Sequence, residues 1–236
     1  MRTLRTAAAT TAGQHVKLCG VIKADAYGHG AAGVADLLTN FYTPDLPAPA
    51  ADVLAVATLE EALALPDLDV PVMVLRPAEC VYLGDNRHAL EAGLRRNVVV
   101  SVISAAGAED VGRLAETLGL RASVQVMLDT GMHREMCPPE DFADVVAAVR
   151  RHAALQLVGV GTHFTDGELE DEPFSDEQLR HFHDAIDPIV ESLPATIWKH
   201  AANSGGTFFT DDDELNMVRP GLAMYGIDPT CGTYAG

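Results

Sequence analysis

Short apolar runs that alternate with helix-forming segments are the feature that most constrains the fold of this sequence. We predict eight strands from these runs, at residues 18–22, 52–57, 70–75, 97–103, 122–128, 155–161, 196–201 and 216–219. Most of the runs are continuously apolar, which is typical of parallel strands covered on both faces. About eight repeats of strand and helix favour an α/β fold of the (β/α)8 TIM-type barrel over a doubly wound open sheet.

Capping residues mark the starts of several predicted helices. Thr58 and Glu61 form a predicted capping box, and Ser104 is a predicted N-cap. Pro138 and Pro139 suit the first turn of the helix that follows them. These signals place helices between the predicted strands, as the barrel requires.

The sequence shows no clear boundary between domains. Residues 43–52 hold three prolines, but the segment is short, and we interpret it as a loop rather than a linker between domains. Residues 1–13 lack a continuous apolar stretch, so we interpret them as the outer part of a helix that leads into the first strand, not as a targeting peptide. We therefore predict a single domain over residues 1–236.

Composition restricts the classes of function. The 34 acidic residues outnumber the 16 basic ones, giving a net charge of −18, and such a surface repels phosphate backbones. No segment is apolar over a length that spans a membrane. The four cysteines are far apart, with no pair typical of zinc or disulfide frameworks. We predict a cytoplasmic protein that binds neither nucleic acid nor membrane.

Polar residues gather at the carboxyl ends of the predicted strands, where barrel enzymes have their active sites. They follow the first, fifth, sixth, seventh and eighth strands. These residues are Lys23, Asp25, Tyr27, Asp129, Thr130, Arg134, Thr162, His163, His200, Asn203, Ser204, Arg219 and Gly221. Because the strand ends of a barrel meet at one face, we expect these side chains to lie close together.

Lys23 is a candidate nucleophile. A lysine at the end of an inner strand is partly desolvated, which lowers its pKa, and a neutral amine can attack a carbonyl to form a Schiff base. The alternative is a structural lysine whose ammonium pairs with Asp25. The motif by itself leaves both open.

The loops after the seventh and eighth strands are a candidate phosphate site. They read "HAANSGGTFF" and "VRPGLAMYG", and Ser204 supplies a hydroxyl while Gly205, Gly206 and Gly221 allow close approach of backbone N–H groups to an anion. Ordinary glycine turns are the alternative. A Schiff-base lysine across the barrel mouth from a phosphate site suggests pyridoxal phosphate.

Two other patterns are assigned less specific roles. "DTG" at 129–131 also occurs in aspartic proteases, but those are β-rich and need two such aspartates, and this chain has one. His181 and His183, two residues apart on a helix, would diverge, so we interpret them as part of a solvated helix face. We interpret residues 210–216 as a surface loop, and we predict no metal site.

The sequence resembles the alanine racemases, which are barrel-type pyridoxal-phosphate enzymes. The resemblance rests on "VIKADAYGHG", "LDTGMHR", "GVGTHF", "HAANS" and "VRPGLAMYG", which occur in the family's order between about residues 16 and 228. It implies interconversion of L- and D-alanine, a supply of D-alanine for peptidoglycan, and a homodimer.

The resemblance also implies a role for each site residue. Lys23 would carry the cofactor as an internal aldimine and act as one of two catalytic bases. The cofactor-binding set comprises Tyr27, Ser204, Gly221 and Leu222 at the phosphate, Arg219 at the pyridine nitrogen with His200 behind it, His163 near the ring, and Asn203. Arg134 would bind the substrate carboxylate and the phenolic oxygen of the cofactor.

Two departures from the family limit this reading. The family's opposite-face base is a tyrosine of a C-terminal β-domain, which we expect to be absent from this chain, and neither Tyr225 nor Tyr234 stands at the matching position. Met127 stands where many relatives have a carbamylated lysine that orients the arginine equivalent to Arg134. Alternatives are a non-catalytic pyridoxal-phosphate carrier or regulator, and a racemase of serine or of a broader set of amino acids.

Overall fold

The computed structural model describes residues 16–40, 49–82, 87–169, 173–230 and 232. The predicted helix over residues 1–13 and most of the predicted loop 43–52 lie outside these residues. Residues 49–52 form neither helix nor strand, as predicted for that loop.

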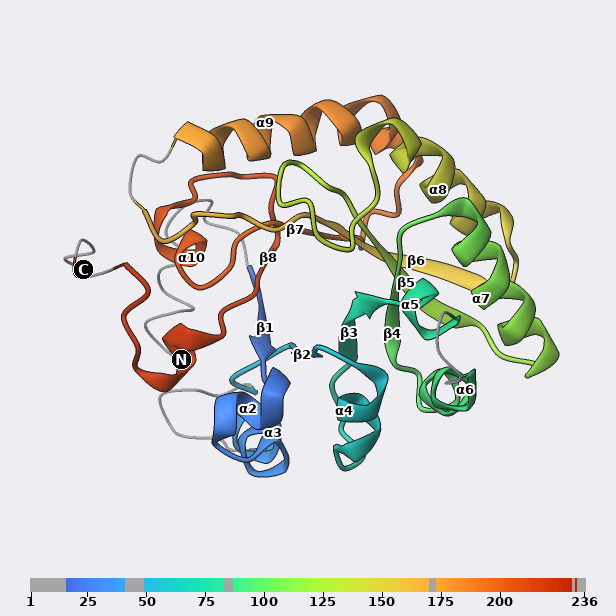
Figure 1. The fold of residues 1–236 in the computed structure, drawn as a ribbon, viewed down its shortest axis with the longest axis horizontal. Coiled ribbons are helices and arrows are strands. Elements are labelled where there is room, and N and C mark those ends of the chain that lie inside the picture. Colours follow the sequence, from blue (N-terminus) through green and yellow to red (C-terminus); the bar gives the residue numbers. More distant parts are fainter. Residues whose placement is uncertain (1–15, 41–48, 83–86, 170–172, 231, 233–236) are drawn as a thin grey trace.

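Eight parallel strands form a nearly closed barrel, which confirms the predicted fold (Figure 1). The strands are β1 (Lys17–Val21), β2 (Val53–Val56), β3 (Val72–Pro77), β4 (Val99–Val102), β5 (Ala122–Met127), β6 (Leu155–Gly161), β7 (Trp198–His200) and β8 (Met217–Val218). Each lies within two residues of a predicted strand. Neighbours along the chain pair with each other from β1 to β7, and β1 also pairs with β8.

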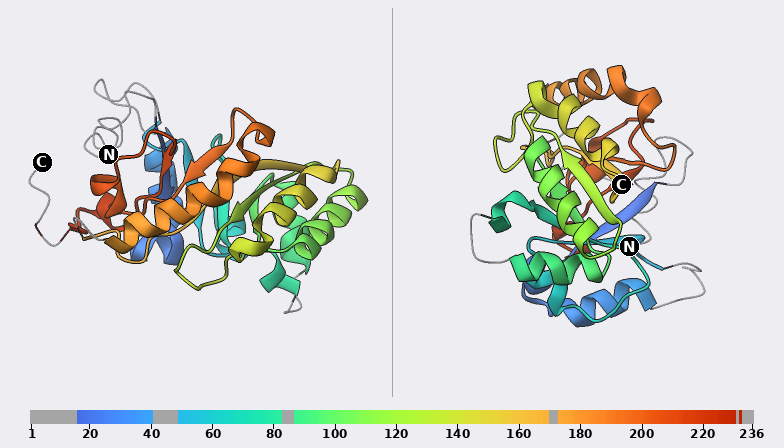
Figure 2. Two further views of the ribbon diagram at one scale, coloured as in Figure 1. Left: turned by 90° about the horizontal axis from the view of Figure 1, so that it is seen from above. Right: turned by 90° about the vertical axis from the view of Figure 1, so that its right-hand side faces the viewer.

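Helices cover the outside of the barrel, as Figure 2 shows from two further directions. They are α2 (Lys23–Gly28), α3 (Ala31–Asn40), α4 (Leu59–Ala64), α5 (Glu79–Tyr82), α6 (Arg87–Arg95), α7 (Ala105–Thr117), α8 (Pro139–Arg151), α9 (Pro173–Ile186) and α10 (Gly206–Phe209), with 3-10 turns η1 (Asp187–Ser192) and η2 (Leu222–Tyr225). None of the described helices is long and apolar enough to cross a membrane.

The predicted caps are present, with one difference. Ser104 caps α7 through Gly107 N–H, and Pro139 is the first residue of α8. Thr58 accepts a hydrogen bond from Glu61 N–H at 3.3 Å, which is half of the predicted capping box. The Glu61 carboxylate does not return to Thr58, because it accepts hydrogen bonds from the N–H groups of Ala57 and Ala24.

Alternate residues of the strands form two separate apolar layers. Cys19, Val53, Met73 and Met217 belong to a buried cluster inside the barrel, and their neighbours, such as Leu54, pack outward against the helices. This alternation is expected of a barrel whose interior is filled by side chains. A filled interior leaves the carboxyl ends of the strands as the place for a pocket.

A seam between β7 and β8 is closed by a side chain rather than by a regular ladder. Asn216 N–H donates to Lys199 O at 3.0 Å, and Asn216 Oδ1 accepts from Lys199 N–H at 2.9 Å. Asn216 Nδ2 also donates to Ile197 O. Above it, Arg219 N–H donates to Ala202 O at 2.9 Å. These bonds hold the loops that follow the two strands next to each other.

Candidate active site

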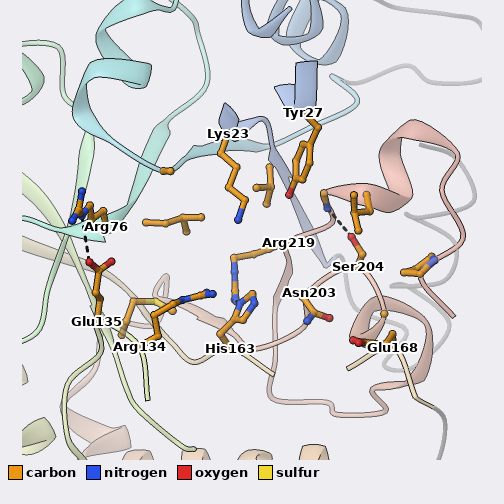
Figure 3. A pocket seen from close by; sticks show the side chains of 18 of the residues that line it. Lys23, Tyr27, Arg76, Arg134, Glu135, His163, Glu168, Asn203, Ser204 and Arg219 are labelled. Carbon is orange, nitrogen blue, oxygen red and sulfur yellow. Dashed lines mark hydrogen bonds and ion pairs between the residues drawn. The ribbon is translucent and has the colours of Figure 1, made fainter. Parts of the chain in front are cut away.

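A pocket of about 660 Å³ lies at the carboxyl ends of the strands (Figure 3). The predicted residues that line it are Lys23, Tyr27, Arg134, His163, Asn203, Ser204, Arg219, Gly221 and Leu222. Figure 3 shows Lys23 and Tyr27 reaching into it from the segment after β1, with Arg134 and His163 on the opposite side. The structure thus brings together nine of the ten predicted site residues, and His200 lies directly behind Arg219.

The segment that carries Lys23 and Tyr27 is a left-handed turn. Ala24, Asp25, Ala26 and Tyr27 have φ values of 51° to 55°, a conformation that costs roughly 1–2 kcal/mol for each residue with a side chain. Hydrogen bonds stabilise this turn: Ala24 N–H donates to Glu61 Oε1 at 2.8 Å, and Asp25 Oδ1 accepts from the N–H of Ala31, the first residue of α3. Backbone strain that the surroundings hold in place is common at functional sites. Here it turns both side chains toward the pocket.

Lys23 is half-buried and forms no ion pair with any described residue. Burial is the largest cause that lowers the pKa of its amine below 10.5; the charge of Arg134 lowers it further, and Glu61 opposes the shift. Asp25 Oδ1 instead accepts a hydrogen bond from the N–H of Ala31, so the structural alternative in which Asp25 pairs with the ammonium is not what the structure shows. A desolvated amine without a carboxylate partner fits a nucleophile or base.

Arg219 is a buried cation at the floor of the pocket, with 4 % of its surface exposed. Its Nη2 group donates to Thr162 O at 2.8 Å and lies 3.0 Å from His163 Nδ1. Its Nη1 group contacts His200 Nδ1. Burial lowers the pKa of the guanidinium to about 10, so Arg219 stays charged at neutral pH. It is a fixed hydrogen-bond donor for a ligand atom above it.

Two residues that the sequence analysis did not single out hold His200 in place. His200 Nε2 lies 3.1 Å from Gln125 Oε1, and Gln125 Nε2 donates to Ser101 Oγ at 2.8 Å. Ser101 in turn donates to Val74 O. Since an amide oxygen only accepts, His200 donates from Nε2 and accepts from Arg219 at Nδ1. The sequence signal was a single polar residue in the middle of each apolar strand, "VVSV" and "ASVQVM".

The environment of His163 and His200 predicts acid sensitivity. Burial, followed by the charge of Arg219, lowers the pKa of His163 to about 3 and that of His200 well below 6.5. The unfolded chain protonates both near 6.5, so it binds more protons than the folded chain below that pH. Stability should therefore fall as the pH drops from about 6.5 toward 3.

His163→Gln is expected to flatten this fall by up to about 1.4 kcal/mol per pH unit, since one titrating group is removed. Urea unfolding between about pH 5 and 6.5, above the range in which ordinary carboxylates titrate, measures the slope. His88→Gln, at an exposed position of α6, is the matched control and should keep the wild-type slope. If the free energy of unfolding of the His163 and His88 variants depended equally on pH, the lowered pKa of His163 would be contradicted.

The other end of the pocket is suited to an anion. Ser204 Oγ accepts from Gly221 N–H at 2.9 Å and lies 3.4 Å from the nitrogen of Ala223, and the Tyr27 hydroxyl lies against the Gly221 Cα. Backbone N–H groups and hydroxyls clustered in this way bind phosphate oxygens. We name Tyr27, Ser204 and Gly221 the anion cup. Asn203 lines the pocket, but its amide bonds Phe164 O and Gly206 N–H, so its observed role is to shape the loop.

Gly221→Ala is expected to weaken binding of a phosphate group at the anion cup by at least about tenfold, or 1.4 kcal/mol. A methyl group at this position would overlap the Tyr27 hydroxyl and push it aside. Titration with pyridoxamine phosphate, which has no aldehyde, measures the cup without the lysine chemistry. Gly33→Ala, in α3 with open space around its Cα, is the control and should bind as the wild type does. Equal affinities for both variants would rule out the anion cup.

The loop that carries Arg134 is anchored at its ends. Cys137 N–H donates to Met127 O at 2.7 Å, and Asp129 N–H donates to Cys137 O at 2.8 Å. Glu135 pairs with Arg76 from β3 at 3.3 Å. Arg134 itself forms no ion pair with any described residue, and Met127 lines the pocket close to it without a polar group. The guanidinium is therefore available to a carboxylate in the pocket.

Among the described residues, no tyrosine of the C-terminal part lies opposite Lys23 in the pocket. Tyr225 lies in η2 and does not line the pocket. The centroid of its ring lies 5.4 Å from that of Tyr27 and 4.5 Å from that of His29, so it packs against these two rings. Tyr234 lies outside the described residues. The DTG aspartate, Asp129, accepts hydrogen bonds from Gly131 and His133 of its own loop, which is a structural role and not that of a protease.

The fold and the site define a class of protein. It is a (β/α)8 barrel in which a lysine amine at the end of β1 shares one pocket with an anion cup built from the segments after β1, β7 and β8. The chain belongs to the alanine racemase family, since residues 2–229 match the model described as alanine racemase, N-terminal domain. This result confirms the resemblance found in the motifs.

Individual relatives agree with the family. The chain is 31% identical to alanine racemase 2 of Caldanaerobacter subterraneus subsp. tengcongensis over 92% of this chain and 53% of that protein. It is similar to the structure of alanine racemase from Clostridium difficile 630 in complex with cycloserine. The TM-score is 0.80, the sequence identity is 28%, and the match covers 100% of this chain and 60% of that one. It is also similar to the structure of alanine racemase from Bartonella henselae with covalently bound pyridoxal phosphate. The TM-score is 0.73, the sequence identity is 26%, and the match covers 100% of this chain and 59% of that one. The chain spans about half the length of the curated relatives it matches.

Proposed function

We propose that this chain binds pyridoxal phosphate between Lys23 and the anion cup and contributes one of the two bases of an alanine racemase. The observation that carries the proposal is the unpaired, desolvated amine of Lys23 in one pocket with the Tyr27 hydroxyl and with the Ser204 hydroxyl, which the Gly221 N–H holds in place. The contact between Tyr27 and Gly221 leaves no room for a side chain there, so the cup is shaped for a ligand that approaches the backbone.

Each residue then has a defined task. When bound, pyridoxal phosphate supplies an electron-accepting ring that acidifies the Cα proton of an attached amino acid. Arg219 would face the ring nitrogen, and because a guanidinium does not give up its proton, that nitrogen would stay unprotonated. Arg134 binds the substrate carboxylate through charge-assisted hydrogen bonds. Lys23 accepts the Cα proton at its Nζ and returns a proton to the same face.

One base and two bases have different isotopic signatures. A single base on one face exchanges the Cα proton with solvent without inversion, and inversion needs a donor on the opposite face. We therefore expect that L-alanine incubated with the chain and pyridoxal phosphate in D2O gains deuterium at Cα faster than it becomes D-alanine. Mass spectrometry measures the deuterium, and chiral chromatography measures D-alanine.

The outcomes separate the proposal from its alternative. Cofactor binding without deuterium exchange and without formation of D-alanine would contradict racemase chemistry and favour the pyridoxal-phosphate carrier or regulator. The observation that supports this alternative is that no described tyrosine lies opposite Lys23. The same assay with L-serine compares the two substrates. A homodimer and a supply of D-alanine for peptidoglycan remain predictions of the resemblance, and a cytoplasmic location remains a prediction of the composition.

A further inference from the structure

We propose that His183, Asp187 and Glu214 form a binding site for one divalent transition-metal ion of the Zn²⁺ type, outside the pocket and beside the seam between β7 and β8. His183 lies in α9, Asp187 begins η1, and Glu214 lies in the loop before β8. One ligand atom from each residue lies within 4.8 Å of the other two. Figure 1 shows α9 running along the outside of the barrel near these strands.

The imidazole of His183 is oriented for a ligand. Its Nε2 lies 2.7 Å from Asp212 Oδ2, and because a carboxylate only accepts, Nε2 carries the proton in the neutral ring. The lone pair is then on Nδ1, which is buried and has no hydrogen-bond partner among the described residues. A carboxylate that fixes the far nitrogen of an imidazole is the usual outer partner of a metal-binding histidine. The orphaned Nδ1 is the observation that distinguishes this cluster from a set of surface acids.

The two carboxylates complete the site. His183 and Asp187 are four residues apart, a spacing that places both side chains on one face of a continuous helical segment. Glu214 Oε2 lies 3.8 Å from His183 Nδ1. The N–H groups of Glu214 and Leu215 donate to Asp212 Oδ1, so the carboxylate that orients the imidazole also folds the loop that supplies Glu214.

The geometry needs only a small contraction. Tetrahedral Zn²⁺ with bonds of about 2.0–2.2 Å holds its ligand atoms roughly 3.4 Å apart. Asp187 and Glu214 are exposed and can change rotamer to close the present separations. An imidazole with two carboxylates suits Zn²⁺ and its neighbours, whereas Mg²⁺ prefers oxygen ligands and water.

Lys199 is the present counter-ion and a competitor for the site. Its Nζ lies 3.1 Å from Glu214 Oε2. With Asp187, Asp212 and Glu214 ionised, one lysine leaves an excess of negative charge around the imidazole. A bound dication would displace the ammonium and link α9 and η1 to the loop before β8, which supplies Glu214.

The proposal predicts opposite changes in Zn²⁺ affinity for two variants, one at His183 and one at Lys199. Replacing His183 should weaken Zn²⁺ binding, and replacing Lys199 by Met should strengthen it, because the competing cation is removed. Asp212→Asn should weaken binding by about 10- to 100-fold, as expected for an outer partner. A purely structural His183–Asp212 pair would not respond to Zn²⁺ at all.

The test is calorimetric titration of the chelator-treated chain with Zn²⁺, and visible absorption with Co²⁺. We expect one saturable site that Mg²⁺ does not occupy, at least a tenfold loss of affinity for His183→Gln, and a gain for Lys199→Met. His181→Gln is the matched control, because His181 lies on the same helix and contacts Glu177 instead. It should bind as the wild type does.

The double variant D187N/E214Q changes two exposed residues, so it keeps the test valid if His183→Gln fails to fold. It too should lose at least tenfold in affinity. Absence of saturable Zn²⁺ binding by the wild type, or wild-type affinity in the His183 and double variants, would overturn the proposal. None of these measurements depends on pyridoxal phosphate or on racemisation.

Discussion

Lys23→Ala is expected to reduce exchange and racemisation of alanine by at least about 10²–10⁴-fold, the range for loss of a positioned proton-transfer group. The amine is the nucleophile and the base in this account, and no other lysine lines the pocket in the described part of the chain. Deuterium incorporation at Cα, measured under the conditions given above, reports the loss.

The same variant should keep its affinity for pyridoxamine phosphate within about tenfold, because Tyr27, Ser204 and Gly221 are untouched. Lys199→Ala is the control for removal of a largely buried lysine, with 15% of its side chain exposed, and should retain exchange. Wild-type exchange rates in Lys23→Ala would remove the residue from the chemistry. A parallel loss in Lys199→Ala would trace the effect to folding.

Arg219→Met is expected to lower the free energy of unfolding by about 2–4 kcal/mol. Thr162 O and the Nδ1 atoms of His163 and His200 would lose their donors, at roughly 1–3 kcal/mol for each buried acceptor left unpaired. Relief of the cost of burying an unpaired cation offsets part of this loss. We expect the unpaired acceptors to dominate, because methionine offers none of them a hydrogen bond.

Urea unfolding measures the Arg219→Met effect, and Arg180→Met is the control. Arg180 is an exposed arginine of α9 that pairs with Asp184, so its loss should change stability by under about 1 kcal/mol. Stability of Arg219→Met equal to or above that of the wild type would mean that the network is under strain and is retained for function alone. Reduced affinity for pyridoxamine phosphate would accompany the destabilisation, since Arg219 lies at the pocket floor.

The barrel and most of the pocket followed from local sequence patterns. Continuous apolar runs locate all eight strands, and the strand ends locate Lys23, Ser204 and Arg219, because parallel strands of a barrel deliver their carboxyl ends to one face. The helix caps at Thr58 and Ser104 could also be predicted, because each depends on a residue only three positions further along the chain.

Features that depend on distant partners were not predictable in the same way. The left-handed turn after Lys23 is stabilised by Glu61, 37 residues after Ala24, and capping rules assigned that carboxylate to Thr58. Gln125 and Ser101 gain their role only when His200, from β7, reaches the barrel interior. His183 was assigned to a solvated face, because the partner that turns it inward, Asp212, is 29 residues away in the chain.

The central claim is that Lys23 holds pyridoxal phosphate at the mouth of the barrel, and one mapping experiment tests it directly. The sequence contains three lysines, Lys17, Lys23 and Lys199, so borohydride reduction of the loaded protein followed by peptide mass spectrometry has few possible outcomes. We predict one phosphopyridoxyl group per chain, on Lys23. A stoichiometric group on Lys17 or Lys199, or a protein that takes up the cofactor without covalent capture at Lys23, would contradict the account.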